Sequence, residues 1–325
     1  MRIEIVKWLE LRDAPIIAWS IVRDEIEFLP WFLDHHRRIG IRHFLMVDDG
    51  SVDGTVDYLL AQEDCMVVRS EVRYADVVDG VRGKDLLRNA IAQRFFCGRW
   101  AFQLDPDEFV FLPSGKGGDL PSLCRALDEA GVVCCWANLV DVYPATFEEV
   151  LLPFQPASEP LAVANCFDYG PYLLLNVTPE STTLAPRTVY GGLRERLYRQ
   201  FGLLSGDQPE ATTGLPAPTI YKVPLVKWSP EKELLNSHLL NIRADPRILL
   251  ALAHVKFAPG LPQRIERALR WRSYWRASIE YRAYAHILES IASSPVPFTW
   301  LHPRTRRLSG PLDLQANGLL FAHIQ

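Results

Sequence analysis

Over residues 14–140, short apolar runs alternate with segments whose apolar positions recur at helical spacing. The apolar runs are rich in β-branched and aromatic residues, and they predict strands at 15–22, 43–47, 66–68, 100–104 and 132–139. The repeats between them predict helices at 25–39, 55–60, 84–96 and 120–130. This alternation is typical of an α/β protein with a mainly parallel sheet flanked by helices.

The pattern is looser in the rest of the chain. Residues 141–190 contain many prolines and few regular repeats, so we expect long loops there. Apolar runs predict strands near 172–177 and 225–228, and a short helix or strand at 245–253. One long helix, rich in arginine and aromatic residues, is predicted at 263–291.

These patterns divide the chain into an α/β domain, residues 1–257, and a C-terminal helical extension, residues 258–325. Within the domain we expect one half at about 14–140, with the regular alternation, and a second half at about 141–257. Ligands of open α/β sheets bind at the carboxyl ends of the strands, so the first half should carry a binding site there.

The composition narrows the class of protein without changing this picture. Of 325 residues, 48% are hydrophobic and 23% charged, and the net charge of −4 argues against a general nucleic-acid binder. No apolar run reaches the roughly 18 residues that span a bilayer, and the N-terminus does not resemble a signal peptide. The six cysteines lack CxxC spacing, which favours core positions over a zinc or disulfide framework. We therefore expect a cytoplasmic protein.

Two carboxylates one residue apart follow the strand predicted at 100–104. Apolar runs flank Asp105 and Asp107 on both sides, and we expect Pro106 to bend the chain so that both carboxylates point the same way. Hard cations such as Mg²⁺ and Mn²⁺ commonly combine one or two protein carboxylates with substrate phosphates. The pattern predicts a metal–diphosphate site, the alternative being an acidic surface turn.

A second acidic motif follows the strand predicted at 43–47. Asp48 and Asp49 precede a glycine turn, and a helix starts at Thr55. Carboxylates in this position can accept hydrogen bonds from a base or ribose, and the helix start favours negative charge nearby. The alternative is an ordinary βα turn with Asp53 as helix cap.

A third motif is basic. Lys84 and Arg88 lie one turn apart on the helix predicted at 84–96, where they can reach a diphosphate, and Asn89 is suited to local hydrogen bonds. A solvated basic face is the alternative interpretation.

In order and spacing, these motifs resemble the family 2 glycosyltransferases of the GT-A fold, which is Rossmann-like. Residues 47–55, VDDGSVDGT, are close to the vDDGStDgt motif of that family, and residues 104–109, LDPDEF, match the LDxDEF metal motif of a bacterial subgroup. Arg88-Asn89 matches the aRN helix. Arg23-Asp24-Glu25 is similar to the strand-end Asn/Asp-Glu, with Asp24 in place of the more usual asparagine. The resemblance covers residues 15 to about 112.

The resemblance implies particular roles for these residues. Asp48 or Asp49, together with Asp24, would contact the nucleotide, and Asp105 and Asp107 would serve a Mn²⁺ or Mg²⁺ ion. The donor would be a nucleoside-diphosphate sugar, most simply a UDP-sugar, and the reaction would invert the anomeric centre. As a ligand of an ion that the donor diphosphate shares, Asp105 would also lie close to the donor.

GT-A enzymes often add a histidine from the C-terminal part of the domain as a further metal ligand, sometimes with a lysine that serves the diphosphate. His254 and Lys256 are similar to such a pair, and His238 is a competing candidate. Either histidine is also compatible with a hydrogen-bonded core position.

An inverting transfer needs a general base for the acceptor hydroxyl. Asp141, after the strand predicted at 132–139, is one candidate, and Glu195, Glu148 and Glu149 are rivals. The sequence does not decide among these four carboxylates.

Other basic residues have two interpretations each. Arg194 and Arg196 can engage phosphate or an acidic acceptor, or lie on a surface hairpin. The helix predicted at 263–291 can contact an anionic membrane or a lipid-linked acceptor, or it can be a packed amphipathic helix with arginines at its edges.

The expected function is metal-dependent, inverting transfer of a sugar to a hydroxyl of a glycan, glycolipid or other acceptor, with or without peripheral contact at the inner face of the membrane. The alternatives are a sugar-nucleotide pyrophosphorylase, a haloacid-type phosphatase and a non-catalytic nucleotide-sugar-binding protein. Residues 20–25, SIVRDE, lack the glycine-rich loop that a pyrophosphorylase has after its first strand. Phe109 and the late position of the acidic motif argue against the phosphatase.

Overall fold

The structure is a computed structural model. It describes residues 1–11, 14–114, 118–170, 173–176, 187–204, 215–218, 220–271 and 275–324.

The first half of the chain forms the parallel part of a large sheet. Its strands run parallel in the order β4-β3-β2-β7, and β1 pairs with β4 antiparallel at the edge. Their bounds are Ile3–Lys7 (β1), Ile16–Val22 (β2), Phe44–Asp48 (β3), Cys65–Ser70 (β4) and Trp100–Gln103 (β7). The central strands are buried almost throughout, as expected of a sheet with helices on both faces. The predicted α/β fold with parallel strands is confirmed here.

The second half extends the same sheet with mixed pairing. β13 lies antiparallel between β7 and β9, whereas β14 pairs parallel with β9 and antiparallel with β8. In the described residues the sheet has 12 strands. The strands of this half are Glu108–Phe111 (β8), Cys134–Tyr143 (β9), Cys166–Asp168 (β10), Tyr221–Lys227 (β13), Ile248–His254 (β14), Thr305–Arg307 (β15) and Phe321–Ala322 (β16). The sheet is therefore mixed as a whole.

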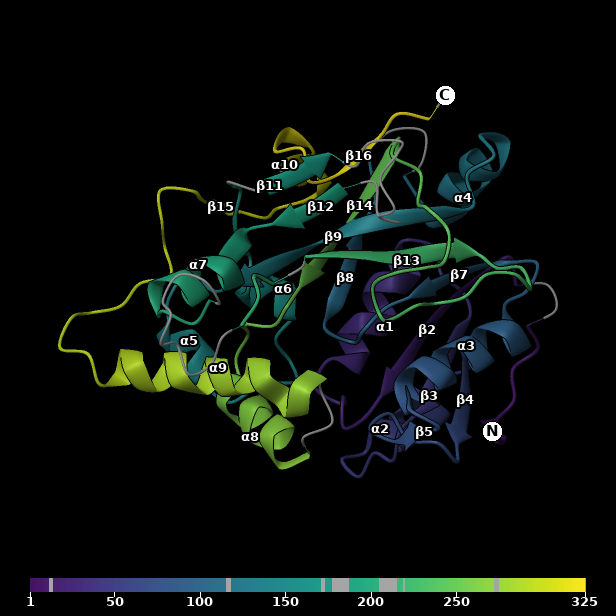
Figure 1. Ribbon diagram of the computed structural model, residues 1–325, viewed down its shortest axis with the longest axis horizontal. Coiled ribbons are helices and arrows are strands. Elements are labelled where there is room, and N and C mark those ends of the chain that lie inside the picture. The colour runs from purple at the N-terminus through teal and green to yellow at the C-terminus, as the bar shows by residue number, and fades with distance from the viewer. Residues whose placement is uncertain are drawn as a thin grey trace.

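Helices cover the sheet and two small hairpins stand beside it (Figure 1). The helices of the first 200 residues are Leu29–Arg38 (α1), Thr55–Leu60 (α2), Gly83–Phe95 (α3), Leu120–Glu129 (α4), Glu148–Leu151 (α5), Pro160–Val163 (α6) and Gly192–Gln200 (α7). The hairpins pair β5 (Val77–Val78) with β6 (Val81–Arg82) and β11 (Leu173–Asn176) with β12 (Arg187–Tyr190).

Helix α1 begins four residues later than predicted. Residues 25–28 form a turn in which the backbone N–H groups of Phe28 and Leu29 donate to the Glu25 carbonyl. Pro30 lies in the first turn of the helix, where its missing N–H has no cost. This turn frees Glu25 from the helix and directs it to the carboxyl edge of the sheet.

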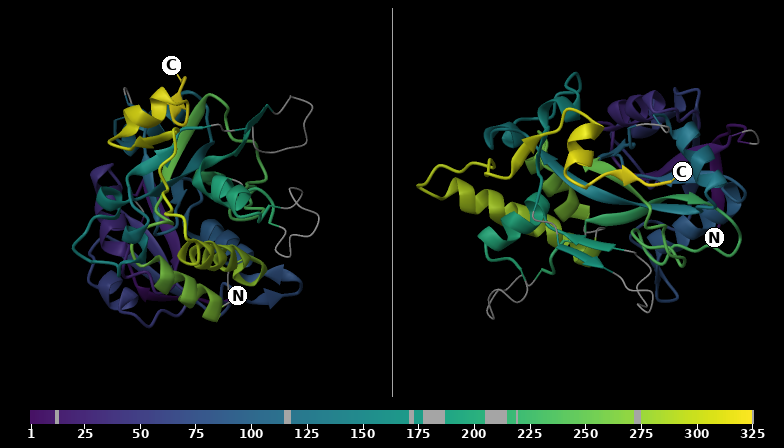
Figure 2. Two further views of the ribbon diagram at one scale, coloured as in Figure 1. Left: turned by 90° about the vertical axis from the view of Figure 1, so that its left-hand side faces the viewer. Right: turned by 90° about the horizontal axis from the view of Figure 1, so that it is seen from above.

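The predicted single helix at 263–291 is two helices. α8 (Leu261–Trp271) and α9 (Trp275–Ala292) pack against each other and lie together on one side of the sheet (Figures 1 and 2). Both place apolar side chains in one buried cluster with Tyr143 and Trp300. No described helix is long and apolar enough to cross a membrane.

The C-terminal segment also returns to the sheet. After α9, β15 pairs with β10, and β16 pairs with β14 next to the short helix α10 (Pro311–Ala316). The region predicted as a helical extension thus contains two sheet strands in addition to its helices.

The direction in which the chain adds successive strands to the sheet reverses between β2 and β7. Chain order runs outward from β2 through β3 and β4, and then crosses to β7 on the other side of β2. At such a switch point the loops after neighbouring strands diverge and leave a crevice at their carboxyl ends. The segments after β2, β3 and β7 are those that carry Asp24, Asp49 and Asp105.

Candidate functional site

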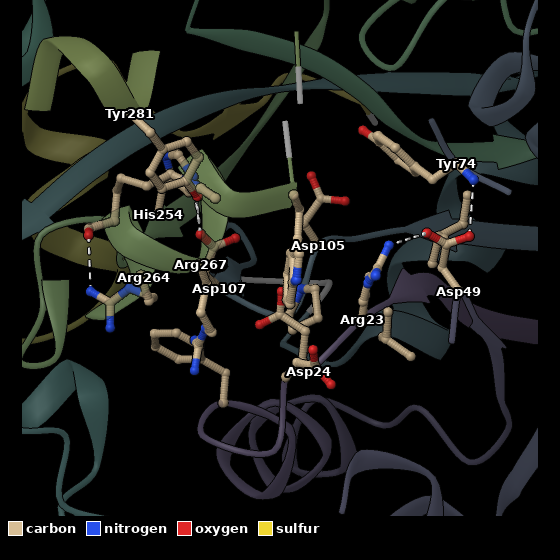
Figure 3. Close-up of a pocket in the computed structure, with 18 residues that line it drawn as sticks. Arg23, Asp24, Asp49, Tyr74, Asp105, Asp107, His254, Arg264, Arg267 and Tyr281 are labelled. Carbon is tan, nitrogen blue, oxygen red and sulfur yellow. Dashed lines mark hydrogen bonds and ion pairs between the residues drawn. The ribbon is translucent and has the colours of Figure 1, made fainter. Parts of the chain in front are cut away.

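Two connected cavities lie at this switch point. The small cavity has a volume of about 170 Å³ and the large cavity about 730 Å³. Five residues line both: Tyr74, Asp105, His254, Lys256 and Tyr281. The two cavities therefore meet at Asp105, which Figure 3 shows in the middle of the small cavity.

Asp105 is the most open carboxylate of the acidic motif. Its side chain is 45% exposed because it faces the cavities, and Lys222 Nζ lies 3.3 Å from Oδ2. Burial of its surroundings raises the pKa of Asp105, but attraction to Lys222 and Arg88 outweighs this and the net pKa is lowered. Asp105 is therefore a charged group with room for a ligand.

Asp107 lies on the other side of Pro106, next to two basic side chains. Its Oδ2 is 3.0 Å from Lys256 Nζ and 3.5 Å from His254 Nε2. Burial would raise its pKa, yet Lys256 and His254 together hold the pKa well below its usual range. Asp107 is thus ionised, and it lines the same small cavity as Asp105.

Behind His254 lies a buried chain of charged groups. The Nδ1 atom of His254 is 3.0 Å from Asp141 Oδ1, and Arg194 Nε donates to Asp141 Oδ2 at 2.8 Å. Despite burial, Arg194 and His254 lower the pKa of Asp141 to about 2. Burial lowers the pKa of His254, but the nearby Asp107 outweighs burial and raises it. Asp141 orients His254 and does not line either cavity.

A second buried ion pair, between Lys222 and Glu108, lies next to Asp105 of the acidic motif. Lys222 Nζ lies 2.6 Å from Glu108 Oε2, and the same Oε2 accepts the Asp105 backbone N–H at 2.8 Å. Burial raises the pKa of Glu108 even with Lys222 beside it. The Glu108 side chain therefore fixes the turn that presents Asp105.

The residues after β2 and β3 form the opposite wall of the small cavity. Asp49 Oδ1 accepts the Tyr74 N–H at 2.9 Å, and its Oδ2 lies 3.9 Å from Arg23 Nη1 (Figure 3). Asp24 has a φ of 53°, a conformation that non-glycine residues rarely adopt, and its Oδ1 accepts the Val52 N–H at 2.6 Å. Backbone strain of this kind is concentrated at functional sites.

Asp48 has a different place from Asp49. It is buried, accepts the Ser51 N–H at 2.9 Å and pairs with Arg69 at 2.8 Å, and it does not line either cavity. Of the two acids that the resemblance left open, Asp49 is the one at the small cavity.

The basic motif on α3 is divided between cavity and core. Lys84 and Arg88 line the large cavity, with the Arg88 guanidinium 5.5 Å from the Tyr74 ring. Asn89 instead bonds the Leu234 backbone twice, donating at 2.9 Å and accepting at 2.8 Å. Its side chain holds a neighbouring loop rather than facing either cavity.

Arg196 and the remaining candidate bases lie away from the cavities. Arg196 donates to Asp168 at 2.8 Å and to the Trp300 carbonyl at 2.9 Å. Glu195 pairs with Arg199 at 2.8 Å, and Glu149 accepts from Thr146 at 2.8 Å. Neither these groups nor Glu148 line either cavity.

The two candidate histidines occupy different positions. His254 contacts Asp107, whereas His238 lines the large cavity with Nδ1 2.7 Å from the Tyr221 carbonyl. Burial lowers the pKa of His238 to about 4, so its ring is neutral and Nδ1 donates to the carbonyl. Its Nε2 is then an acceptor.

Sequence reasoning missed Glu25, Trp271 and Tyr74 as site residues. All three line the small cavity, where the Arg23 guanidinium lies 4.7 Å from the Trp271 ring. Trp271 comes from α8 and Tyr74 from the irregular segment after β4, so no local pattern ties them to the acidic motif. Glu25 follows Asp24 directly, and its proximity to the strand end was the available signal.

The pKa of Glu25 makes the stability of the protein depend on pH. Burial, and then the negative charge of Asp107, raise its pKa from 4.5 to about 8. Between pH 4.5 and 8 the folded protein holds a proton on Glu25 that the unfolded chain has lost. Stability from this group is therefore complete below pH 4.5 and is lost as the pH rises through 8.

We expect Glu25→Gln to remove this dependence. Urea unfolding from pH 5 to 7 should give a free energy of unfolding whose slope with pH differs between wild type and variant by about one proton, and the difference should vanish above about pH 8. Glu63→Gln, at an exposed helix-flanking position, is the matched control. Equal slopes for wild type and Glu25→Gln would mean that Glu25 is ionised in the folded protein at neutral pH.

The donor set fits a hard divalent cation held jointly with a phosphate ligand. Asp105 and Asp107 offer oxygen ligands at one cavity, and Mg²⁺ sites of this kind use one or two carboxylates and leave the rest to substrate and water. Within the described parts of the chain, no three His, Cys, Asp or Glu side chains form a preassembled cage. A cation would thus depend on the ligand that accompanies it.

Comparison with known proteins adds no assignment. Neither a protein-family model nor a curated protein sequence matches the chain.

Proposed function

We propose that this chain is a metal-dependent, inverting glycosyltransferase of the GT-A type, which moves a sugar from a nucleoside-diphosphate sugar, most simply a UDP-sugar, to a hydroxyl acceptor. One observation carries the proposal. At the switch point of the sheet, the acids that follow β2, β3 and β7 line one small cavity, which opens at Asp105 into a larger one.

The small cavity suits the nucleotide end of the donor. Asp24 and Asp49 offer carboxylate acceptors for ribose or base hydrogens, and the Trp271 ring offers an aromatic face. The diphosphate would then lie toward Asp105 and Asp107, where a bound Mn²⁺ or Mg²⁺ supplies Lewis-acid stabilisation of the leaving group.

The cations at the junction suit the diphosphate itself. Lys256 lies 3.0 Å from Asp107, and Arg88 lines the large cavity together with Asp105. Burial would lower the pKa of both cations, but Asp107 raises the pKa of Lys256, and Tyr74 and Asp105 raise that of Arg88, so both remain charged. Ammonium and guanidinium groups held in place can stabilise negative charge that grows on a departing phosphate. His254 keeps Asp107 oriented for the same purpose.

The large cavity suits the sugar and the acceptor. Its lining comes from α3, α7, β13 and α9, that is from both halves of the chain and the C-terminal segment. We infer a carbohydrate or lipid-linked acceptor. In α8, Arg267 pairs with Glu27 at 3.1 Å and Arg264 donates to backbone carbonyls, so these two arginines favour the packed-helix interpretation over a membrane-facing one.

A thermal-shift series tests the proposal. UDP with Mn²⁺ should raise the melting temperature, because a ligand at a hundred times its Kd stabilises the folded state by about 2.7 kcal/mol. UDP without metal and Mn²⁺ alone are the controls, with ADP and GDP to test the base. If no nucleoside diphosphate stabilises the protein with Mn²⁺, the proposal is wrong.

A second measurement separates an enzyme from a binding protein. A glycosyltransferase without acceptor should slowly hydrolyse its UDP-sugar in a metal-dependent reaction, releasing UDP. Stabilisation by UDP without any such release from a panel of UDP-sugars would favour a non-catalytic sugar-nucleotide-binding protein.

A further inference from the structure

The large cavity contains few carboxylates that could take a proton. Among the described residues that line it, the acidic side chains are Asp105, Glu108 and Glu280. Asp105 lies at the junction with the small cavity, and Glu108 is buried against Lys222 and the Asp105 backbone. Only Glu280 in this set lines the large cavity alone and is open to it.

Glu280 is presented by the first turns of α9. Its side chain is 37% exposed, and its Oε1 lies 3.8 Å from Arg194 Nη1. Two residues earlier, the buried Ser278 has a φ of 62° and its hydroxyl donates to the Ala268 carbonyl at 2.7 Å. Ser278, in this strained conformation, lines the large cavity together with Glu280.

A continuous chain of charged contacts joins Glu280 to the acidic motif. Its links are Asp107–His254 at 3.5 Å, His254–Asp141 at 3.0 Å, Asp141–Arg194 at 2.8 Å and Arg194–Glu280 at 3.8 Å. The inner members are buried, so their geometry is fixed by one another. Arg194 divides its guanidinium between Asp141 and Glu280, which ties the position of Glu280 to that of Asp107.

We propose that Glu280 is the general base of the transfer reaction, an inference that rests on the proposed function. The Glu280 carboxylate takes the proton of the acceptor hydroxyl while the hydroxyl oxygen bonds to the anomeric carbon. The bond from that carbon to the diphosphate oxygen breaks, and the diphosphate leaves with its electron pair. Asp141, Arg194 and His254 are then positioning residues, and the base comes from the C-terminal segment.

Donor hydrolysis tests this assignment without knowledge of the acceptor, since water then replaces the hydroxyl. Glu280→Gln should lower the rate of metal-dependent UDP release at least about a hundredfold, the usual contribution of a general base. Stabilisation by UDP and Mn²⁺ should be unchanged, because UDP lacks the sugar that Glu280 faces. Glu289→Gln, at an exposed position on the same helix, is the matched control and should retain full activity.

Rescue of activity by azide distinguishes a carboxylate that acts as a general base from one that has only a structural role. Azide needs no deprotonation, so its nitrogen can bond to the anomeric carbon as the bond to diphosphate breaks, giving a glycosyl azide and UDP. In Glu280→Ala, added azide should restore UDP release and yield the glycosyl azide, and Glu289→Ala should show no such dependence.

The outcomes are distinguishable from failure of the proposed function. If wild type neither binds UDP with Mn²⁺ nor releases UDP, the glycosyltransferase assignment falls and this inference with it. If wild type does both and Glu280→Gln hydrolyses the donor at the wild-type rate, Glu280 is not the base. Loss of hydrolysis without rescue by azide would likewise overturn the assignment and leave a positioning role.

Discussion

Replacing Asp105 with asparagine is expected to abolish the Mn²⁺-dependent stabilisation of this protein by UDP. The carboxylate faces the cavities, and its change to a neutral amide removes the metal ligand that we propose without altering the side-chain shape. Because metal stabilisation of a leaving phosphate is worth several kcal/mol, UDP release from a UDP-sugar should also fall by about a hundredfold or more.

The fold of Asp105→Asn should be intact, since the side chain is half exposed and the Glu108 contact uses the Asp105 backbone. Asp107→Asn should lose metal binding too, but it also leaves Lys256 without its carboxylate partner and removes one of the two carboxylates beside His254, so this variant should be less stable. Asp57→Asn, an exposed acid on α2, is the control. Unchanged UDP stabilisation in Asp105→Asn would place the metal elsewhere.

Among the variants proposed for this protein, Lys222→Met is expected to lower the free energy of unfolding the most. The substitution leaves the Glu108 carboxylate buried without its counter-ion, and breaking a buried pair in this way costs about 3–5 kcal/mol. Urea unfolding at pH 7 measures the loss. Adding Glu108→Leu to this variant removes the uncompensated charge, so the double variant should recover much of the stability.

The same strand offers a matched control. Lys227 on β13 pairs with Asp128 at 2.6 Å, but both side chains are about 40% exposed. Exposed pairs contribute about 0–1 kcal/mol, so Lys227→Met should unfold nearly as wild type does. A loss for Lys222→Met no larger than that of Lys227→Met would show that Glu108 is neutral in the folded protein.

The first half of the fold could be predicted from local patterns because its strands are buried on both faces and read as continuous apolar runs. β8 escaped prediction, since Glu108–Phe111 directly follows the acidic turn and contains the buried Glu108. The two-helix form of 263–291 also escaped prediction. Both helices place apolar side chains in one buried cluster with Tyr143 and Trp300, and such long-range contacts are not contained in the local pattern.

Only those residues of the candidate site that come directly after a predicted strand could be predicted from the sequence. Asp24, Asp49, Asp105 and Asp107 follow strands that the apolar pattern already indicated, and all four line the small cavity. Glu280 lies far along the chain on a helix whose sequence gives no sign that it lines the large cavity. Contacts between distant segments bring it there, and a single sequence does not specify such contacts.

The cations that meet Asp107 depend on the spacing of residues at the end of β14. His254 ends that strand and Lys256 follows two residues later, while Val255 between them points into the core. An extended chain sends alternate side chains to opposite faces, so both cations reach one carboxylate only while exactly one residue separates them. This segment should therefore tolerate exchange of one apolar residue for another at Val255. An insertion or deletion there would instead turn His254 or Lys256 to the opposite face of the chain, and its contact with Asp107 would be lost.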